Sequence, residues 1–212
     1  MIIQPSLTKI IGMLKIFDPN SGEIFVDKTN AICYENISIS MAEALSDQTL
    51  SSGAKIGYIY QMAFGNGGTS VDPTGVITYL PPNTVGENVS LYNQTYSQVV
   101  DQNSPSDTDP AFNRMSVLHT PGTVYSDILI TCLLDYGQPQ GQQAFDNSTN
   151  FSGEYVFDEL GLQTFEGLDS SNNPLLRLIT HVIFCPVQKA LNRQIQIDYT
   201  IRIQTMSTIT SS

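Results

Sequence analysis

The sequence predicts an all-β fold, an antiparallel β-sandwich with long polar loops and one short helix. The clearest indication is the segment 194–204, where isoleucines and a tyrosine at odd positions alternate strictly with polar residues at even positions. Period-two alternation is expected of a strand that has one face on a core. In addition, short apolar segments are separated by stretches rich in Gly, Pro, Asn and Ser, and no fixed-period repeat or heptad pattern is present.

Length and composition predict a single domain. The chain has 212 residues, and we expect residues 1–12 to form an N-terminal arm and residues 13–212 one sandwich with a long loop insertion at about 70–125. Only 14% of the residues are charged and the net charge is −11, which argues against direct, sequence-specific nucleic-acid binding. The chain lacks the long apolar run of a membrane span and, at its start, a secretory signal. We therefore expect that the protein is made in the cytoplasm and does not associate with a membrane.

The first third of the chain predicts a hairpin, a helix and a central strand. Residues 13–17 and 23–26 are mainly apolar and flank Asp18–Gly22, which is rich in turn formers. Ser38 to Ser40 can cap a helix through Met41–Leu45, where apolar residues fall at i, i+3 and i+4. From Lys55 the chain enters a first central strand that includes residues 58–64.

Turn-forming residues dominate 66–125, with short apolar pieces at 76–80 and 91–96. Loops this long are usually functional or form interfaces, so we expect part of the region to order only against a neighbouring subunit. Further strands are predicted downstream, at 125–134, 153–162, 178–184 and 194–204.

The glycine loop Gly65–Thr69 looks like a phosphate cradle. Such a cradle needs a helix after it and a Gly-Lys-Ser/Thr signature, and residues 70–75 are turn formers instead. A tight turn that requires positive φ explains the glycines better. We therefore expect no bound cofactor.

No set of residues predicts catalysis. Asp158 and Glu159 are paired carboxylates, but neighbours on a strand project to opposite faces, so we expect a surface acid beside an acid at the edge of the core. The chain has no Gly-x-Ser-x-Gly nucleophile elbow. We expect no catalytic residues and no enzyme.

Metal binding has little support either. His119 and His181 are far apart in sequence, and no Cys/His cluster supplies the three or four ligands of a zinc site. Asp101, Asp107 and Asp109 could hold a hard cation, but they lack the spacing and central glycine of an EF-hand. Solvated carboxylates are the simpler interpretation, and we expect no metal.

The three cysteines, Cys33, Cys132 and Cys185, are far apart and odd in number. This spacing does not favour a disulfide framework or a zinc site. We interpret them as buried free thiols.

Several short motifs, taken in order, resemble virion structural proteins of tailed bacteriophages. The chain is also similar to the N-terminal attachment modules of tail-collar fibres, in which an Ala-Phe-Gly-x-Gly loop precedes a Glu-x-Gly-Leu strand. The blocks that carry the resemblance, scattered over about residues 15 to 205, are Asp18–Glu23, Asn30–Ile32, Met62–Thr69, Val156–Leu162, His181–Lys189 and Ile197–Ile203.

The resemblance implies a virion protein of the tail, neck or collar, or baseplate. The chain departs from the fibre pattern because it stops just after Ile203 without fibrous repeats and inserts the polar region 70–125. Both departures favour a connector role, in which the protein assembles with copies of itself and with other virion proteins. We expect the assembly interface at Gly65, Asn66, Gly67, Gly68, Thr69, Tyr92 and Tyr96, and we expect valine at Gly67 and Gly68 to block assembly while leaving the monomer folded.

Two alternatives remain open. A capsid decoration protein would have the same composition and fold. A carbohydrate- or receptor-binding β-sandwich would need exposed aromatic residues, and since the chain has no Trp, Tyr92, Tyr96 and Tyr125 would have to replace it.

Overall fold

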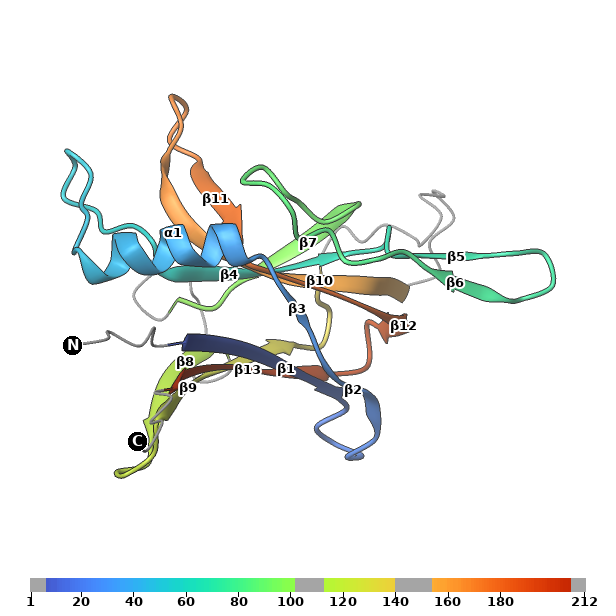
Figure 1. Ribbon diagram of the computed structural model, residues 1–212. Coiled ribbons are helices and arrows are strands. Elements are labelled where there is room, and N and C mark those ends of the chain that lie inside the picture. The colour runs from blue at the N-terminus through green and yellow to red at the C-terminus, as the bar shows by residue number, and fades with distance from the viewer. Residues whose placement is uncertain (1–6, 102–112, 140–153, 207–212) are drawn as a thin grey trace.

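The protein is a sandwich of two antiparallel sheets with one helix at its edge (Figure 1). The computed structural model describes residues 7–101, 113–139 and 154–206. The five-stranded sheet has the order β2-β1-β13-β9-β8 and the six-stranded sheet the order β3-β12-β10-β4-β7, with β11 paired to β10. Strands β5 and β6 form a separate two-stranded sheet. This architecture confirms the predicted fold class.

The helix and strands have the following bounds: β1 Leu7–Phe17, β2 Ile24–Thr29, β3 Ala31–Ile32, α1 Tyr34–Leu45, β4 Ile59–Gly65, β5 Thr69–Val71, β6 Ile77–Tyr79, β7 Gln94–Val99, β8 Arg114–His119, β9 Tyr125–Leu134, β10 Glu154–Leu168, β11 Pro174–Leu178, β12 Thr180–Ala190 and β13 Ile195–Met206.

Strand β13 lies at the centre of the five-stranded sheet, as its alternation predicted. Ile195, Ile197, Tyr199 and Ile201 are buried, while the residues between them are partly exposed. The strand pairs with β1 on one side and β9 on the other, each without a register shift. Its apolar face packs toward the six-stranded sheet, because isoleucines at alternate positions present one continuous apolar surface.

The predicted hairpin at the start of the chain is confirmed as β1 and β2. One Asp18 carboxylate oxygen accepts hydrogen bonds from the backbone N–H of Asn20 (2.8 Å) and Ser21 (3.2 Å), and Gly22 adopts φ +76°. The prediction of an arm over residues 1–12 is wrong for residues 7–12, which belong to β1. They pair with residues 201–206 of β13. This pairing stabilises a strand in a segment for which we predicted none. Residues 1–6 lie outside the described residues.

The central strands of the six-stranded sheet are buried on both faces. On the inner face, the ring of Phe157 contacts those of Phe64 (5.4 Å between centroids) and Phe184 (5.7 Å). On the outer face, residues 80–93 lie over the sheet, and Leu91 and Leu178 belong to a second small apolar cluster there. Polar groups on either face of these strands therefore need partners from the chain itself.

Helix α1 begins at Tyr34, earlier than the predicted start near Ser38. Its first turn contains Asn36, which is fully buried and donates hydrogen bonds to the backbone oxygens of Leu178 (2.8 Å) and Glu87 (3.1 Å). These tertiary contacts extend the helix into residues of modest helix propensity.

The predicted insertion at 70–125 contains more regular structure than expected. Strands β5 and β6 form a hairpin, β7 pairs with β4, and β8 pairs with β9, all within one chain. Residues 102–112 lie outside the described residues. Among the described residues, no helix is long and apolar enough to cross a membrane.

The interpretation of the cysteines is confirmed for two of the three. Cys33 and Cys132 are buried and free, and burial raises the pKa of the Cys33 thiol to about 12. Cys185 is also free but exposed, so its predicted burial is wrong. It lies in the part of β12 where pairing with β10 is irregular, next to Pro186, which has no N–H to donate.

Candidate functional site

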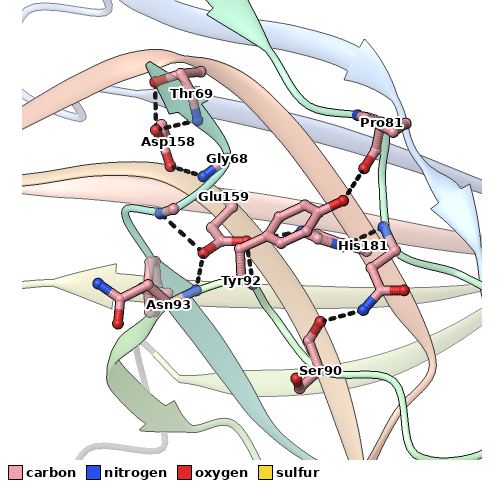
Figure 2. A network of polar contacts seen from close by, with 12 residues as sticks. Gly68, Thr69, Pro81, Ser90, Tyr92, Asn93, Asp158, Glu159 and His181 are labelled. Carbon is pink, nitrogen blue, oxygen red and sulfur yellow. Dashed lines mark hydrogen bonds and ion pairs between the residues drawn. The ribbon is translucent and has the colours of Figure 1, made fainter. Parts of the chain in front are cut away.

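The glycine loop Gly65–Thr69 joins β4 to β5 and encloses a carboxylate from β10 (Figure 2). Asp158 accepts hydrogen bonds from the backbone N–H of Gly68 (3.0 Å) and of Thr69 (2.8 Å), and from the Thr69 hydroxyl. The backbone N–H groups of the loop thus point at an anion, as in a phosphate cradle. The anion is the chain's own side chain, which fills the place that a phosphate would take.

A second carboxylate, that of Glu159, lies on the other side of the same loop. One of its oxygens accepts from the N–H of Gly67 (3.1 Å) and of Asn93 (2.8 Å). The other accepts from the N–H of Tyr92 (2.9 Å) and is 3.0 Å from Nε2 of His181. This side chain therefore connects the glycine loop, the two residues before β7 and strand β12.

Asp158 and Glu159 are both fully buried, and the prediction that one of them is a surface acid is wrong. The reason is a β-bulge. The pairing of β10 with β12 shifts between Phe157 and Glu159, so that more residues of β12 than of β10 lie in the interval. The alternation also breaks on β10 itself, because Phe157 and Leu160, three positions apart, both belong to the core between the sheets. Both carboxylates can therefore reach the glycine loop.

Hydrogen bonding identifies the tautomer of His181. The backbone N–H of Asn83 donates to Nδ1 at 2.8 Å, so Nδ1 carries no proton. Nε2 is then the protonated nitrogen and donates to Glu159. The ring is fully buried and lies 5.6 Å from the ring of Tyr92, whose hydroxyl donates to the backbone oxygen of Pro81 (2.7 Å). We call Asp158, Glu159, His181 and the glycine loop the polar centre.

The pKa values of the two carboxylates are shifted in opposite directions. Burial raises the pKa of Asp158, and its hydrogen bonds to Thr69 and Gly68 offset this only in part. For Glu159, burial is the largest single influence and raises the pKa, but the hydrogen bonds from His181, Asn93, Tyr92 and Gly67 together outweigh it and lower the pKa. The arrangement thus stabilises an ionised Glu159 beside a less acidic Asp158.

The glycines are required by close packing and not by positive φ, so that part of the prediction is wrong. Positive φ occurs at other glycines, but not at Gly65, Gly67 or Gly68. A Cβ at Gly67 would lie 2.8 Å from Cβ of Tyr92 and 2.9 Å from the Asn93 nitrogen. A Cβ at Gly68 would lie 2.9 Å from Cγ2 of Ile183. These contacts argue against the expectation that valine at Gly67 and Gly68 leaves the monomer folded, and we expect such a variant to be destabilised.

The predicted assembly interface is mostly interior to the chain. Gly65, Asn66, Gly68 and Thr69 are buried and Gly67 is half-buried, because residues 92–93 and β10 cover the loop. Tyr96 is also half-buried, and its ring packs 5.8 Å from that of Phe64. Only Tyr92, which is 43% exposed, offers substantial surface to a second subunit. An interface at these residues stays a prediction, and within one chain most of them pack against residues 92–93 and β10.

The remaining candidate residues do not converge. His119 lies on β8 of the five-stranded sheet and contacts Tyr125 and Ser126, whereas His181 belongs to the other sheet. Asp101 is buried, and Asp107 and Asp109 lie outside the described residues. Among the residues that the structure describes, no group of three or more His, Cys, Asp or Glu side chains could hold a metal ion.

Sequence reasoning missed the partnership of Glu159 with His181. Both residues interrupt apolar strand segments, 155–162 and 178–184. A charged and a titratable residue in strands buried on both faces need hydrogen-bond partners. That requirement was the available signal.

Comparisons with known protein families, with curated proteins and with solved structures find no match to this chain.

Proposed function

We propose that the protein is a structural component of a tailed-phage virion, in the tail, neck or collar, or baseplate, where it assembles with copies of itself and with neighbouring virion proteins. The resemblance of six sequence blocks to such proteins is the starting point. Three of these blocks, Met62–Thr69, Val156–Leu162 and His181–Lys189, include residues of the polar centre. A fourth, Asn30–Ile32, includes β3, which pairs with β12 at His181.

The observation that carries the proposal is the closure of the polar centre. Its two carboxylates are fully buried and accept hydrogen bonds from backbone N–H groups, a hydroxyl and an imidazole of the same chain. A reacting site must present such groups to a substrate. Here they join the glycine loop, residues 83–93 and two strands of one sheet. This supports a stabilising role and a non-enzymatic, structural protein.

A sugar-binding module finds less support, because the tyrosines that would stack on a sugar already have intramolecular partners. The Tyr92 hydroxyl donates to Pro81, that of Tyr96 donates to Gln98 (2.7 Å), and the Tyr125 ring carries the Arg202 guanidinium 4.0 Å from its centre. A capsid decoration protein remains the second candidate, since the same fold and low charge suit it.

The proposal is tested by light scattering of the purified chain over a range of concentrations, followed by negative-stain imaging. A ring or other defined oligomer is the expected result and gives its symmetry. A strict monomer at every concentration would contradict self-assembly and favour a decoration protein that binds only to a particle surface.

A further inference from the structure

A pocket of about 590 Å³ lies beside the C-terminal end of helix α1, where three aromatic rings meet. Tyr58, Tyr60 and Phe165 line it together with Ala44 of the helix, and we call it the aromatic pocket. The ring of Phe165 lies 5.6 Å from that of Tyr58 and 5.7 Å from that of Tyr60, measured between centroids. A pocket of this size, with aromatic walls and a few polar groups, is typical of a small-molecule site.

Backbone hydrogen bonds hold the lining residues of the aromatic pocket in place. The N–H of Phe165 donates to the backbone oxygen of Tyr58 (2.9 Å). The backbone oxygen of Tyr60 accepts from the N–H groups of Val100 (2.9 Å) and Asp101 (3.1 Å), which brings the Asp101 side chain to the pocket wall. The pocket is therefore formed before a ligand enters, so binding costs little conformational entropy.

The charges of the aromatic pocket favour a cation. Its charged lining residues are Asp47, Lys55 and Asp101, so the lining has one more negative charge than positive. Asp47 and Lys55 form an ion pair with each other (2.7 Å), whereas Asp101 lies deeper and is only 4% exposed. Burial raises the pKa of Tyr58 to about 12, and the nearby charge of Asp101 adds to this rise. A cation is attracted to this carboxylate, while an anion is repelled by it and by the net charge of −11.

The arrangement of the rings favours an organic cation over an apolar molecule or a sugar. Ring faces attract cations, because the π electrons make them electronegative. The planes of the three rings are tilted to one another by 31°, 39° and 64°, so they form no common flat surface on which a sugar could stack. Rings that meet at an angle around one pocket are typical of the cages that bind quaternary ammonium groups. A purely apolar ligand would cover the Asp101 carboxylate without offsetting its charge, which is unfavourable.

We propose that the aromatic pocket binds a quaternary ammonium group, with the rings of Tyr58, Tyr60 and Phe165 against its methyl groups and the carboxylate of Asp101 as the opposite charge. One chain supplies all of these groups. The inference therefore goes beyond the proposed self-assembly and does not depend on it.

An NMR titration of the full chain with choline chloride tests the proposal. We expect saturable binding, with nuclear Overhauser effects between the choline methyl protons and the three rings. The uncharged analogue of choline, in which carbon replaces the nitrogen, should bind at least about fivefold more weakly. Tyr60→Leu and Asp101→Asn should each weaken choline binding at least about threefold. Tyr34→Leu, which removes a 65% exposed ring outside the pocket, is the matched control and should bind choline like the wild type.

Four results would overturn the proposal. The uncharged analogue could bind as tightly as choline, which would show an apolar pocket without preference for a cation. The wild type could fail to bind choline, or could show Overhauser effects only to residues outside the pocket. Folded Tyr60→Leu and Asp101→Asn could bind choline like the wild type. Glucose, titrated as a sugar probe, could bind in the pocket in place of choline. Thermal unfolding checks that each variant is folded, and Tyr58→Leu repeats the titration if one is not.

Discussion

Nε2 of His181 lies 3.0 Å from a carboxylate oxygen of Glu159, and neither side chain is exposed to solvent. Since Nδ1 of the same ring accepts the Asn83 N–H, the imidazole donates to Glu159 from Nε2. We predict that ¹⁵N NMR of the folded chain at neutral pH will show His181 protonated on Nε2 alone. His119, which is exposed on β8, serves as the internal comparison. A ring protonated on Nδ1 would contradict the orientation of this network.

Replacement of Glu159 by glutamine should destabilise the fold by about 3 kcal/mol. Each carboxylate oxygen accepts from two donors, so the amide NH₂ of Gln would face donors in either orientation. Chemical denaturation measures the change. Glu35→Gln, at an exposed position in the first turn of α1, should change stability by no more than about 0.5 kcal/mol. Equal effects of the two substitutions would show that the buried hydrogen bonds of Glu159 contribute little.

The same pair predicts a pH dependence. The folded state lowers the pKa of Glu159 below its ordinary value of 4.5, so the stability that its ionised form contributes is present above that value and is lost as the pH falls. The difference in unfolding free energy between the wild type and Glu159→Gln should therefore shrink below about pH 4.5. A difference that stays constant down to pH 3 would contradict the lowered pKa. Asp158 is present in both proteins, but the charge of Glu159 contributes to its raised pKa, so glutamine at position 159 also makes the pKa of Asp158 less raised.

Alanine at Gly67 should cost about 1–3 kcal/mol of stability, because its Cβ would meet backbone and Cβ atoms that cannot rotate away. Ser70→Ala, at an exposed position on β5, should leave stability nearly unchanged. Thermal unfolding of both variants shows whether Gly67 is needed for packing within the monomer or only for an interface with another subunit. A Gly67→Ala monomer as stable as the wild type, but unable to assemble, would restore the interface interpretation of the loop.

Lys189 is fully buried, and its Nζ donates to the backbone oxygens of Asp135 (3.0 Å) and Ala190 (2.9 Å). Burial lowers its pKa from 10.5 to about 8. Between these values the unfolded chain binds a proton that the folded chain does not, so this group makes the wild type more stable as the pH rises. Lys189→Met lacks the group, and its stability relative to the wild type should fall from pH 8 to 10 by at most about 1.4 kcal/mol per pH unit. A pH-independent difference would show that Lys189 stays charged in the folded protein.

The parts of the fold that could be predicted from the sequence are those in which a single local pattern of residues determines the structure. Strand β13 alternates because one of its faces meets the core and the other does not. The first hairpin has a turn that its own Asp18 and Gly22 stabilise. In both cases residues close in sequence suffice.

The polar centre could not be predicted in this way, because residues distant in sequence determine it. The bulge at Asp158 depends on how β10 pairs with β12, and the partners of Glu159 come from residues 67, 92, 93 and 181. The sequence identified the glycine loop and the adjacent carboxylates separately. Only the pairing of strands shows that the loop binds those carboxylates.

The central claim is that the glycine loop is bound to the chain's own carboxylates and is not an open binding site. Amide hydrogen exchange at Gly67, Gly68 and Thr69, followed by NMR with and without inorganic phosphate, tests it most directly. We predict slow exchange at all three amides and no effect of phosphate. Fast exchange that phosphate slows would contradict the account and would show that the loop binds an external anion.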